Sequence, residues 1–269
     1  MVWLKTATTG FTDWHKLKIA KFLAGGVPAW GMVDGPELVV FKGHPLFNDY
    51  ETSGDRIPLK DVQLLPPVLP TTKILCIGKN YQEHADEMGL GTPTEPLIFF
   101  KPTSALIGPE ETIVIPSQVT TDVDPEGELV IVIGALAKNV SEEDAMDYVW
   151  GFTIGNDVSA RDIQTKDGQW ARAKGFDTFC PLGPWIETEF VPEGQILETR
   201  VDGEIRQRSS NSNMIFDIPR IIQHVTEAMT LLPGDVIFTG TPAGVSNIKP
   251  GDVVEIEVEG IGVLRNPVA

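Results

Sequence analysis

Short apolar runs rich in β-branched residues limit most strongly what this 269-residue chain can fold into. Each run is bounded by Gly, Pro, Asn or Asp, a pattern typical of strands separated by turns. The runs lie at 38–41, 73–77, 112–115, 129–133, 236–239 and 253–258. The sequence therefore predicts a β-rich α+β fold, and it disfavours a doubly wound parallel sheet.

Helical patterns are few by comparison. Ser141 is predicted to open one helix as its N-cap, with Asp144 near the capping-box position. A second helix is predicted over residues 217–229, and a short one over 81–88. These helices supplement a fold that consists mainly of strands.

The segment 65–70 reads Leu-Pro-Pro-Val-Leu-Pro and cannot continue a strand or a helix. It predicts a boundary between a small N-terminal domain, residues 1–68, and a main domain, residues 69–269. The chain length fits one or two domains. Every residue with a defensible chemical role lies in the second segment.

Charge and composition exclude several classes of protein. The 21 Lys and Arg residues against 38 Asp and Glu residues give a net charge of −17, which repels phosphate backbones and anionic membranes. No apolar stretch of about 18 residues predicts a transmembrane helix. The N-terminus lacks a secretory layout, and the 2 cysteines fit a reducing compartment. We therefore expect a cytoplasmic protein that binds neither nucleic acid nor membranes.

Three carboxylates form the strongest candidate site. Glu126 and Glu128 directly precede the apolar run 129–133, and positions two apart on a strand project from the same face. Their mutual repulsion calls for a cation or a shared proton, although an acidic turn in solvent would produce the same local pattern. Asp157 ends the apolar segment 151–157 and supplies a third oxygen ligand. Such oxygens suit Mg²⁺, Mn²⁺ or Ca²⁺ better than Zn²⁺.

A His-x-x-Glu pair follows the predicted strand 73–77. On a helical turn, His84 and Glu87 would lie side by side, and the carboxylate would leave one imidazole nitrogen free as a general base. A surface helix pair is the plainer alternative. Further groups suited to an anionic substrate lie in neighbouring segments: Lys101, Arg161, Gln164, Lys174 and Thr241.

Six spaced segments together resemble the fumarylacetoacetate hydrolase family across residues 71–267. The matching segments are GKNYQEHADEM (78–88), FFKP (99–102), DPEGELVIVIG (125–134), GFTIGNDVSARD-Q (151–164), KGFDTFCPLGP (174–184) and TGTPAGV (239–245). The resemblance implies a mixed β-roll or sandwich around a Mg²⁺ or Mn²⁺ site, and it suggests a homodimer.

The resemblance also implies roles for individual residues. The metal ligands would be Glu126, Glu128 and Asp157. His84 and Glu87 would form a catalytic dyad on a lid over the substrate. Four side chains would contact the substrate, and of these Gln164 and Lys174 would hold a developing oxyanion. The four are Arg161, Gln164, Lys174 and Thr241, and Lys101 would add a nearby cation.

One difference from the family pattern limits the range of expected substrates. Eukaryotic fumarylacetoacetases have a further Asp ligand just ahead of the NYxxH-type motif, where this chain has 75–78, Leu-Cys-Ile-Gly. The sequence resembles the smaller branch of acylpyruvate hydrolases, oxaloacetate decarboxylases and homoprotocatechuate-pathway isomerase/decarboxylases.

Three functions remain open at this point. The first is divalent-metal-dependent cleavage of the C3–C4 bond of a small anionic 2-oxo acid through a metal-stabilised enolate, as oxaloacetate decarboxylase or acylpyruvate hydrolase. The second is an isomerase or decarboxylase of unsaturated 2-oxo or 2-hydroxy diacids in aromatic catabolism. The third is a non-catalytic metal-stabilised binding module, which would need neither His84 nor Glu87.

Overall fold

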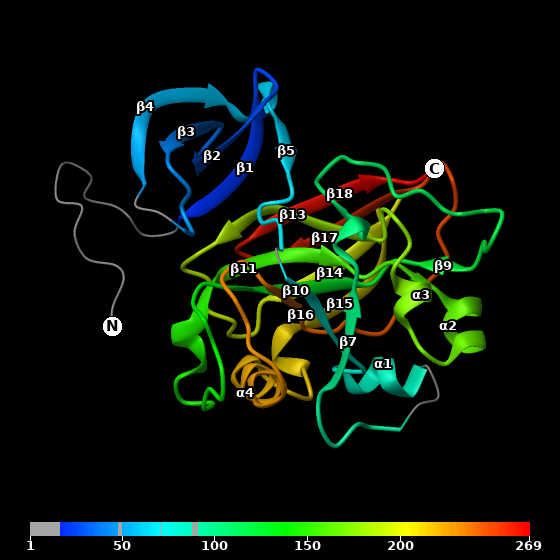
Figure 1. The fold of residues 1–269 in the computed structure, drawn as a ribbon. Coiled ribbons are helices and arrows are strands. Elements are labelled where there is room, and N and C mark those ends of the chain that lie inside the picture. Colours follow the sequence, from blue (N-terminus) through cyan, green and yellow to red (C-terminus); the bar gives the residue numbers. More distant parts are fainter. Residues whose placement is uncertain (1–16, 48–49, 71, 88–90) are drawn as a thin grey trace.

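The computed structural model describes residues 17–47, 50–70, 72–87 and 91–269, and Figure 1 shows their arrangement. Strands dominate, in sheets of 12, 4 and 2 strands. The predicted β-rich α+β fold is therefore confirmed, because helices only cover the edges and ends of these sheets. In the described residues, no helix has the length and apolar character needed to cross a bilayer.

The N-terminal strands form an antiparallel meander in the order β4-β3-β2-β1, drawn in blue in Figure 1. Its members are β1 (Lys18–Ala24), β2 (Val27–Asp34), β3 (Glu37–Lys42) and β4 (Glu51–Pro58), with β5 (Gln63–Leu65) paired to β1. Strand β1 also pairs with β13 of the main segment, with Ile19 opposite Ile186. The N-terminal strands are thus hydrogen-bonded to the main sheet, and the division near residue 68 stays a prediction.

The rest of the large sheet contains the longest buried strand. In sheet order the strands are β13 (Cys180–Glu187), β11 (Val149–Asn156), β10 (Gly127–Ile133), β16 (Val236–Phe238), β6 (Ile74–Gly78) and β7 (Leu97–Lys101), while β8 (Leu106–Ile107) pairs with β13. All seven residues of β10 are buried, as expected for an apolar run covered on both faces.

A four-stranded sheet packs against β10 and β11. Its strands are β14 (Ile196–Val201), β15 (Glu204–Ser210), β17 (Val253–Val258) and β18 (Gly262–Pro267), and the short strands β9 (Val123–Asp124) and β12 (Ser159–Ala160) form a separate pair. Burial alternates along β17, so that Val254, Ile256 and Val258 enter the core between the two sheets. This packing produces the sandwich that the resemblance implied.

Two of the three predicted helices are present. Helix α4 (Ile218–Ala228) has Asp217 as its N-cap, with the carboxylate accepting from the Arg220 backbone N–H at 3.0 Å. The short prediction corresponds to α1 (Gln82–Glu87), while α2 (Arg161–Asp167) and α3 (Ala171–Lys174) were not predicted. The 3₁₀ turns are η1 (Leu59–Asp61), η2 (Thr103–Ala105), η3 (Ala145–Tyr148) and η4 (Asn211–Asn213).

Two predictions of secondary structure are wrong. Ser141 and Asp144 form the expected capping contacts, but only the 3₁₀ turn η3 follows before β11 starts at Val149. The run 112–115 is not a strand, since it forms one isolated bridge, between Ile113 and Val268 at the C-terminus. Pro116 then ends the pairing.

Gly155 provides a test of the packing between the central strands. A Cβ atom at this position would lie 2.2 Å from the Phe238 ring, whereas one at Gly91 would have no atom within 4 Å. We expect Gly155→Ala to lower the free energy of unfolding by ~1–3 kcal/mol, the usual cost of overpacking. Chemical denaturation measures it, with Gly91→Ala as control. Equal denaturation midpoints for the two variants would contradict the prediction, because they would show that the Phe238 ring can move to accommodate the added methyl group.

Candidate active site

The strand order of the large sheet brings the predicted residues to one place. Strand β10 runs antiparallel to β11 and β16, and β16 runs parallel to β6. The first residues of β10 therefore lie at the same end of the sheet as the last residues of the other three strands. Eight of the ten predicted site residues line a single pocket at this end of the sheet. The other two, Glu87 and Lys101, contact residues that line it.

Glu126, Glu128 and Asp157 converge in this pocket. One oxygen from each carboxylate lies within 4.8 Å of the other two, and all three residues are buried. The backbone keeps the carboxylates together, because the Asp157 N–H donates to the Glu126 carbonyl at 2.9 Å. The Asn156 side chain also accepts from the Glu126 N–H at 2.9 Å. The alternative of an acidic turn in solvent is therefore excluded.

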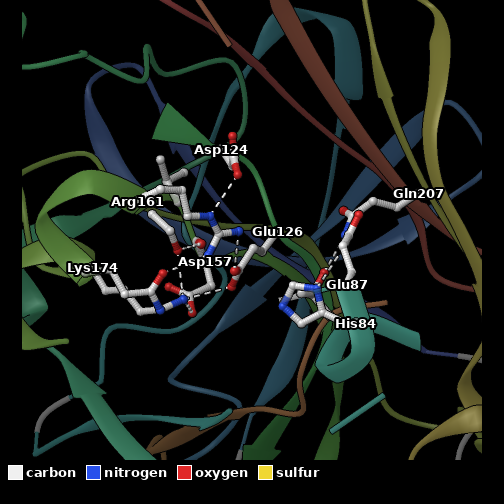
Figure 2. Close-up of polar contacts among 12 residues, drawn as sticks. His84, Glu87, Asp124, Glu126, Asp157, Arg161, Lys174 and Gln207 are labelled. Atoms are coloured by element: carbon white, nitrogen blue, oxygen red, sulfur yellow. Dashed lines mark hydrogen bonds and ion pairs between the residues drawn. The ribbon is translucent and has the colours of Figure 1, made fainter. Parts of the chain in front are cut away.

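Two lysines approach the carboxylates from inside the protein. Lys174 Nζ donates to Glu126 at 2.8 Å, to Asp157 at 2.6 Å and to Ser159 Oγ at 2.7 Å, as Figure 2 shows in part. Burial disfavours its charge, but attraction by Asp157 and Glu126 raises the pKa of Lys174. Three acceptors and a raised pKa therefore favour Lys174 as a fixed cation. Lys101 also donates to Asp157, at 2.6 Å, but Lys101 is not among the residues that line the pocket.

Arg161 bridges several groups with its guanidinium (Figure 2). Its Nε donates to Asp124 at 2.8 Å, Nη2 pairs with Glu126 at 2.7 Å, and Nη1 donates to Gln164 at 3.0 Å. Burial opposes the charge on Glu126, but Lys174 and Arg161 together lower its pKa far below the usual range. Lys174 and Arg161 thus favour the ionised form of Glu126.

Glu128 has the opposite environment. Its only hydrogen bond among the described residues comes from the Gly240 N–H, at 2.6 Å, and no described cation lies within ion-pair distance. Burial and the nearby charges of Asp157 and Glu126 raise its pKa well above the ordinary value. Four buried carboxylates therefore face two buried lysines and one partly buried arginine here: Asp124, Glu126, Glu128 and Asp157 against Lys101, Lys174 and Arg161.

A divalent cation fits this set of groups. It would neutralise Glu128, and the donors are carboxylate oxygens, which Mg²⁺ and Mn²⁺ prefer. Glu126, Glu128 and Asp157 would hold it, with Lys174 sharing two of these carboxylates. An added charge of +2 would also leave the pocket cationic and suited to an anionic substrate.

The His-Glu pair lies across the carboxylates from Lys174 in Figure 2. His84 Nδ1 is 3.3 Å from Glu87 Oε2, and His84 is buried in the pocket lining. The Gly244 N–H lies 3.2 Å from both Glu87 oxygens, which fixes α1 to the loop after β16. The second imidazole nitrogen, Nε2, has no bond to the described residues and remains available to a substrate.

Thr241 is held by a residue that the sequence did not reveal. The Thr241 hydroxyl donates to the Gly127 carbonyl at 2.9 Å and accepts from Gln207 Nε2 at 2.7 Å. The side-chain oxygen of the buried Gln207, Oε1, accepts from the Gly127 N–H at 3.0 Å. Gln207 comes from β15 of the other sheet, about 80 residues from Gly127 in the chain, so no local pattern could have indicated it.

An aromatic wall was also missed. The rings of Phe99 and Trp170 meet edge to face at 5.2 Å and lie 4.9 and 5.9 Å from Lys174 Nζ. A Cβ atom at Gly78 would approach the Trp170 ring to 2.7 Å, so only glycine fits there without movement. Phe99 lies close to Lys101 in the chain, and Trp170 lies close to Lys174. This closeness in sequence to predicted site residues was the one indication that the two rings line the pocket.

Comparison with known families finds two matches. Residues 73–269 match the family described as "Fumarylacetoacetate (FAA) hydrolase C-terminal". Residues 17–67 match the family described as "Rv2993c-like, N-terminal". The two matches together cover most of the described chain.

Individual proteins show the same similarity. The chain is 52% identical to Protein Rv2993c of Mycobacterium tuberculosis over 228 residues, 84% of this chain and 85% of that protein. It is 44% identical to "Oxaloacetate tautomerase fahd2, mitochondrial" of Xenopus laevis, over 77% of this chain and 69% of that protein. A solved structure described as 2-hydroxyhepta-2,4-diene-1,7-dioate isomerase from Mycobacterium marinum superposes with a TM-score of 0.87 at 45% identity, covering 94% and 98% of the two chains.

Proposed function

Since this chain belongs to the fumarylacetoacetate hydrolase family, we propose that it is a divalent-metal-dependent enzyme that forms the enolate of a small 2-oxo acid. One observation supports this most directly. Three buried carboxyl groups meet at the pocket, and that of Glu128 has no described cation beside it. A site with this charge is suited to Mg²⁺ or Mn²⁺ and then to an anionic, oxygen-rich substrate.

Two residues near the carboxylates, Lys174 and His84, would stabilise charge and transfer a proton. A bound ion would supply Lewis acidity, polarising the 2-oxo group and stabilising negative charge on the enolate oxygen. Lys174 keeps a second positive charge at the pocket wall, where it can hold that oxygen. His84 presents its free nitrogen to the pocket and can take a proton from C3 of the substrate or return one.

Proton transfer at C3, as a tautomerase or isomerase, is the reaction we favour. It needs one oriented base, and Glu87, itself anchored by the Gly244 N–H, orients His84. Two relatives carry the names of such reactions, oxaloacetate tautomerase and a dioate isomerase. Decarboxylation alone would make no demand on a base, and a mere binding module would need no dyad.

Cleavage of the C3–C4 bond is the second candidate, because it proceeds through the same enolate. In hydrolysis of an acylpyruvate, His84 would deprotonate the water that attacks the acyl carbon. In decarboxylation of oxaloacetate, carbon dioxide leaves without a nucleophile, and His84 would only protonate the product. The position of His84 in the pocket supports hydrolysis more than decarboxylation.

A panel of substrates tests the proposal. Purified protein is assayed with oxaloacetate, acetylpyruvate and an unsaturated 2-oxo diacid, each with added Mn²⁺ and after chelator treatment. We expect turnover of at least one, abolished by chelation and restored by metal. Turnover that survives exhaustive chelation would contradict metal dependence.

His84→Gln distinguishes the reactions from one another. We expect a loss of ~10²–10⁴ in kcat/KM for tautomerisation and for acylpyruvate hydrolysis, because both need the base. Oxaloacetate decarboxylation should fall much less, and Mn²⁺ affinity should remain near that of the wild type, since His84 is outside the carboxylate set. His44→Gln, in the loop after β3 of the N-terminal segment, is the matched control. Equal losses in all three reactions would mean that His84 serves a shared step instead.

A further inference from the structure

Lys79 is a pocket cation without a partner. Three cationic side chains line the pocket, and Arg161 and Lys174 are tied to buried carboxylates. Lys79 is half-buried and makes no ion pair or hydrogen bond with any described side chain. In a chain of net charge −17, a cation left free at a pocket is a candidate binding group.

The backbone at Lys79 is unusual. Its φ of +59° lies in the left-handed region, which costs free energy for a residue with a side chain and which glycine adopts freely. Asn80 holds it there: its side chain donates to the Phe216 and Thr239 carbonyls at 3.0 and 2.7 Å and accepts from the Phe216 N–H at 2.8 Å. These three hydrogen bonds of Asn80 fix the backbone position from which the Lys79 side chain extends, directly after β6.

Lys79 also borders a second hollow. This hollow is lined by segment 91–98 and by His224 of α4, and Lys79 is the residue that it shares with the metal pocket. Its wall includes Pro93, Pro96 and Leu97, which suit a carbon chain, and also the carboxylate of Glu95, so that Lys79 and not the far wall is the group that would attract an anion. A substrate held at the carboxylates could therefore extend past Lys79 into this hollow.

We infer that Lys79 binds the distal carboxylate of the substrate, so that the enzyme prefers a 2-oxo diacid with a carbon chain over the matching monoacid. The inference rests on the proposed function for the position of the 2-oxo group. Lys79 is the cation lining the pocket that remains free to pair, since Arg161 and Lys174 already neutralise protein carboxylates. It acts on substrate choice and not on the proton transfer itself.

Two six-carbon acids test the inference. 2-Oxoadipate and 2-oxohexanoate share the 2-oxo acid group and differ at the far end by one carboxylate. Exchange of the C3 hydrogens for deuterium, followed by NMR with Mn²⁺ kept low or replaced by Mg²⁺, gives kcat/KM for each. Calorimetry gives the dissociation constants of both acids with the same metal-loaded protein.

We expect the wild type to prefer the diacid in both measurements. Lys79→Met should reduce the diacid-to-monoacid ratio at least tenfold, chiefly through the KM and dissociation constant of the diacid. Lys79→Arg should restore most of the ratio because it keeps the charge. Lys60→Met, an exposed lysine of the N-terminal segment, is the control for general charge effects and should leave the ratio unchanged.

The outcomes separate the two proposals. If neither acid exchanges deuterium, the proposed function is wrong, and the dissociation constants still decide the role of Lys79. Equal binding of the two acids by the wild type would overturn the inference. So would an unchanged ratio of dissociation constants in Lys79→Met, or a loss of the same size in Lys60→Met.

Discussion

Glu128→Gln should weaken Mn²⁺ binding at least ~100-fold and reduce metal-dependent turnover to near background. Even a change in a residue that merely orients a metal ligand commonly costs 10–100-fold in affinity, and here a carboxylate ligand itself is lost. The same variant should melt at a higher temperature than the wild type when both are free of metal. Its neutral amide replaces a carboxyl group whose ionised form is disfavoured by burial and by the charges of Asp157 and Glu126. Calorimetric titration with Mn²⁺ and thermal melting in chelator give both results.

Glu198→Gln is the matched control for this variant. Glu198 is also buried and paired, with Arg200 and Arg208, but it lies on β14 away from the pocket. Its replacement should leave Mn²⁺ affinity unchanged. An unaltered Mn²⁺ affinity in Glu128→Gln would remove this residue from the metal site, whatever its activity.

Lys174→Met should destabilise the metal-free protein by ~3–5 kcal/mol, because it leaves Glu126 and Asp157 buried with fewer counter-charges. A bound divalent ion would supply positive charge at the same oxygens and offset much of that loss. We therefore expect saturating Mn²⁺ to raise the melting temperature of the variant more than that of the wild type. Turnover should fall ~10²–10³-fold even when metal is saturating, since a fixed cation at the developing oxyanion is gone.

Lys73→Met provides the comparison. Lys73 pairs at 2.6 Å with the fully buried Asp235, at the other end of β6 from the pocket. Its loss should also destabilise the protein, but Mn²⁺ should not rescue it beyond the shift seen in the wild type. An equal Mn²⁺ shift in Lys174→Met and the wild type would contradict the shared position of the lysine and the ion.

The carboxylates were predictable from the sequence because their positions depend on local patterns. Glu126 and Glu128 stand at the start of an apolar run with the pattern of a buried strand, and Asp157 follows the neighbouring strand. His84 and Glu87 meet because three residues separate them on a helical turn. In each case a short segment determines both the element and the direction of the side chains.

Residues that support the site from afar were not predictable in this way. Gln207 and Asn80 act through contacts to segments about 80 to 160 residues away. The packing of the two sheets brings Gln207 close, and the pairing of β6 with β16 brings Asn80 close. Lys101 looked like a substrate contact, but its place on the edge strand β7 turns it towards the back of Asp157. The strand predicted at 112–115 ends at Pro116 after one isolated bridge, and the helix predicted at Ser141 is replaced by the turn η3 before β11 begins.

Deuterium exchange into pyruvate tests the central claim most directly. Pyruvate has the 2-oxo acid group and C3 hydrogens but no C3–C4 bond, so that exchange reports formation of the enolate and nothing later. Chelator-treated protein is incubated with pyruvate in deuterium oxide, with and without added Mg²⁺, and the methyl signal is followed by NMR. We predict exchange above the rate with Mg²⁺ alone when protein and Mg²⁺ are both present, and none above background in chelator or with Glu128→Gln. Exchange that is equally fast in chelator, or absent although calorimetry shows the metal and pyruvate bound, would contradict the account.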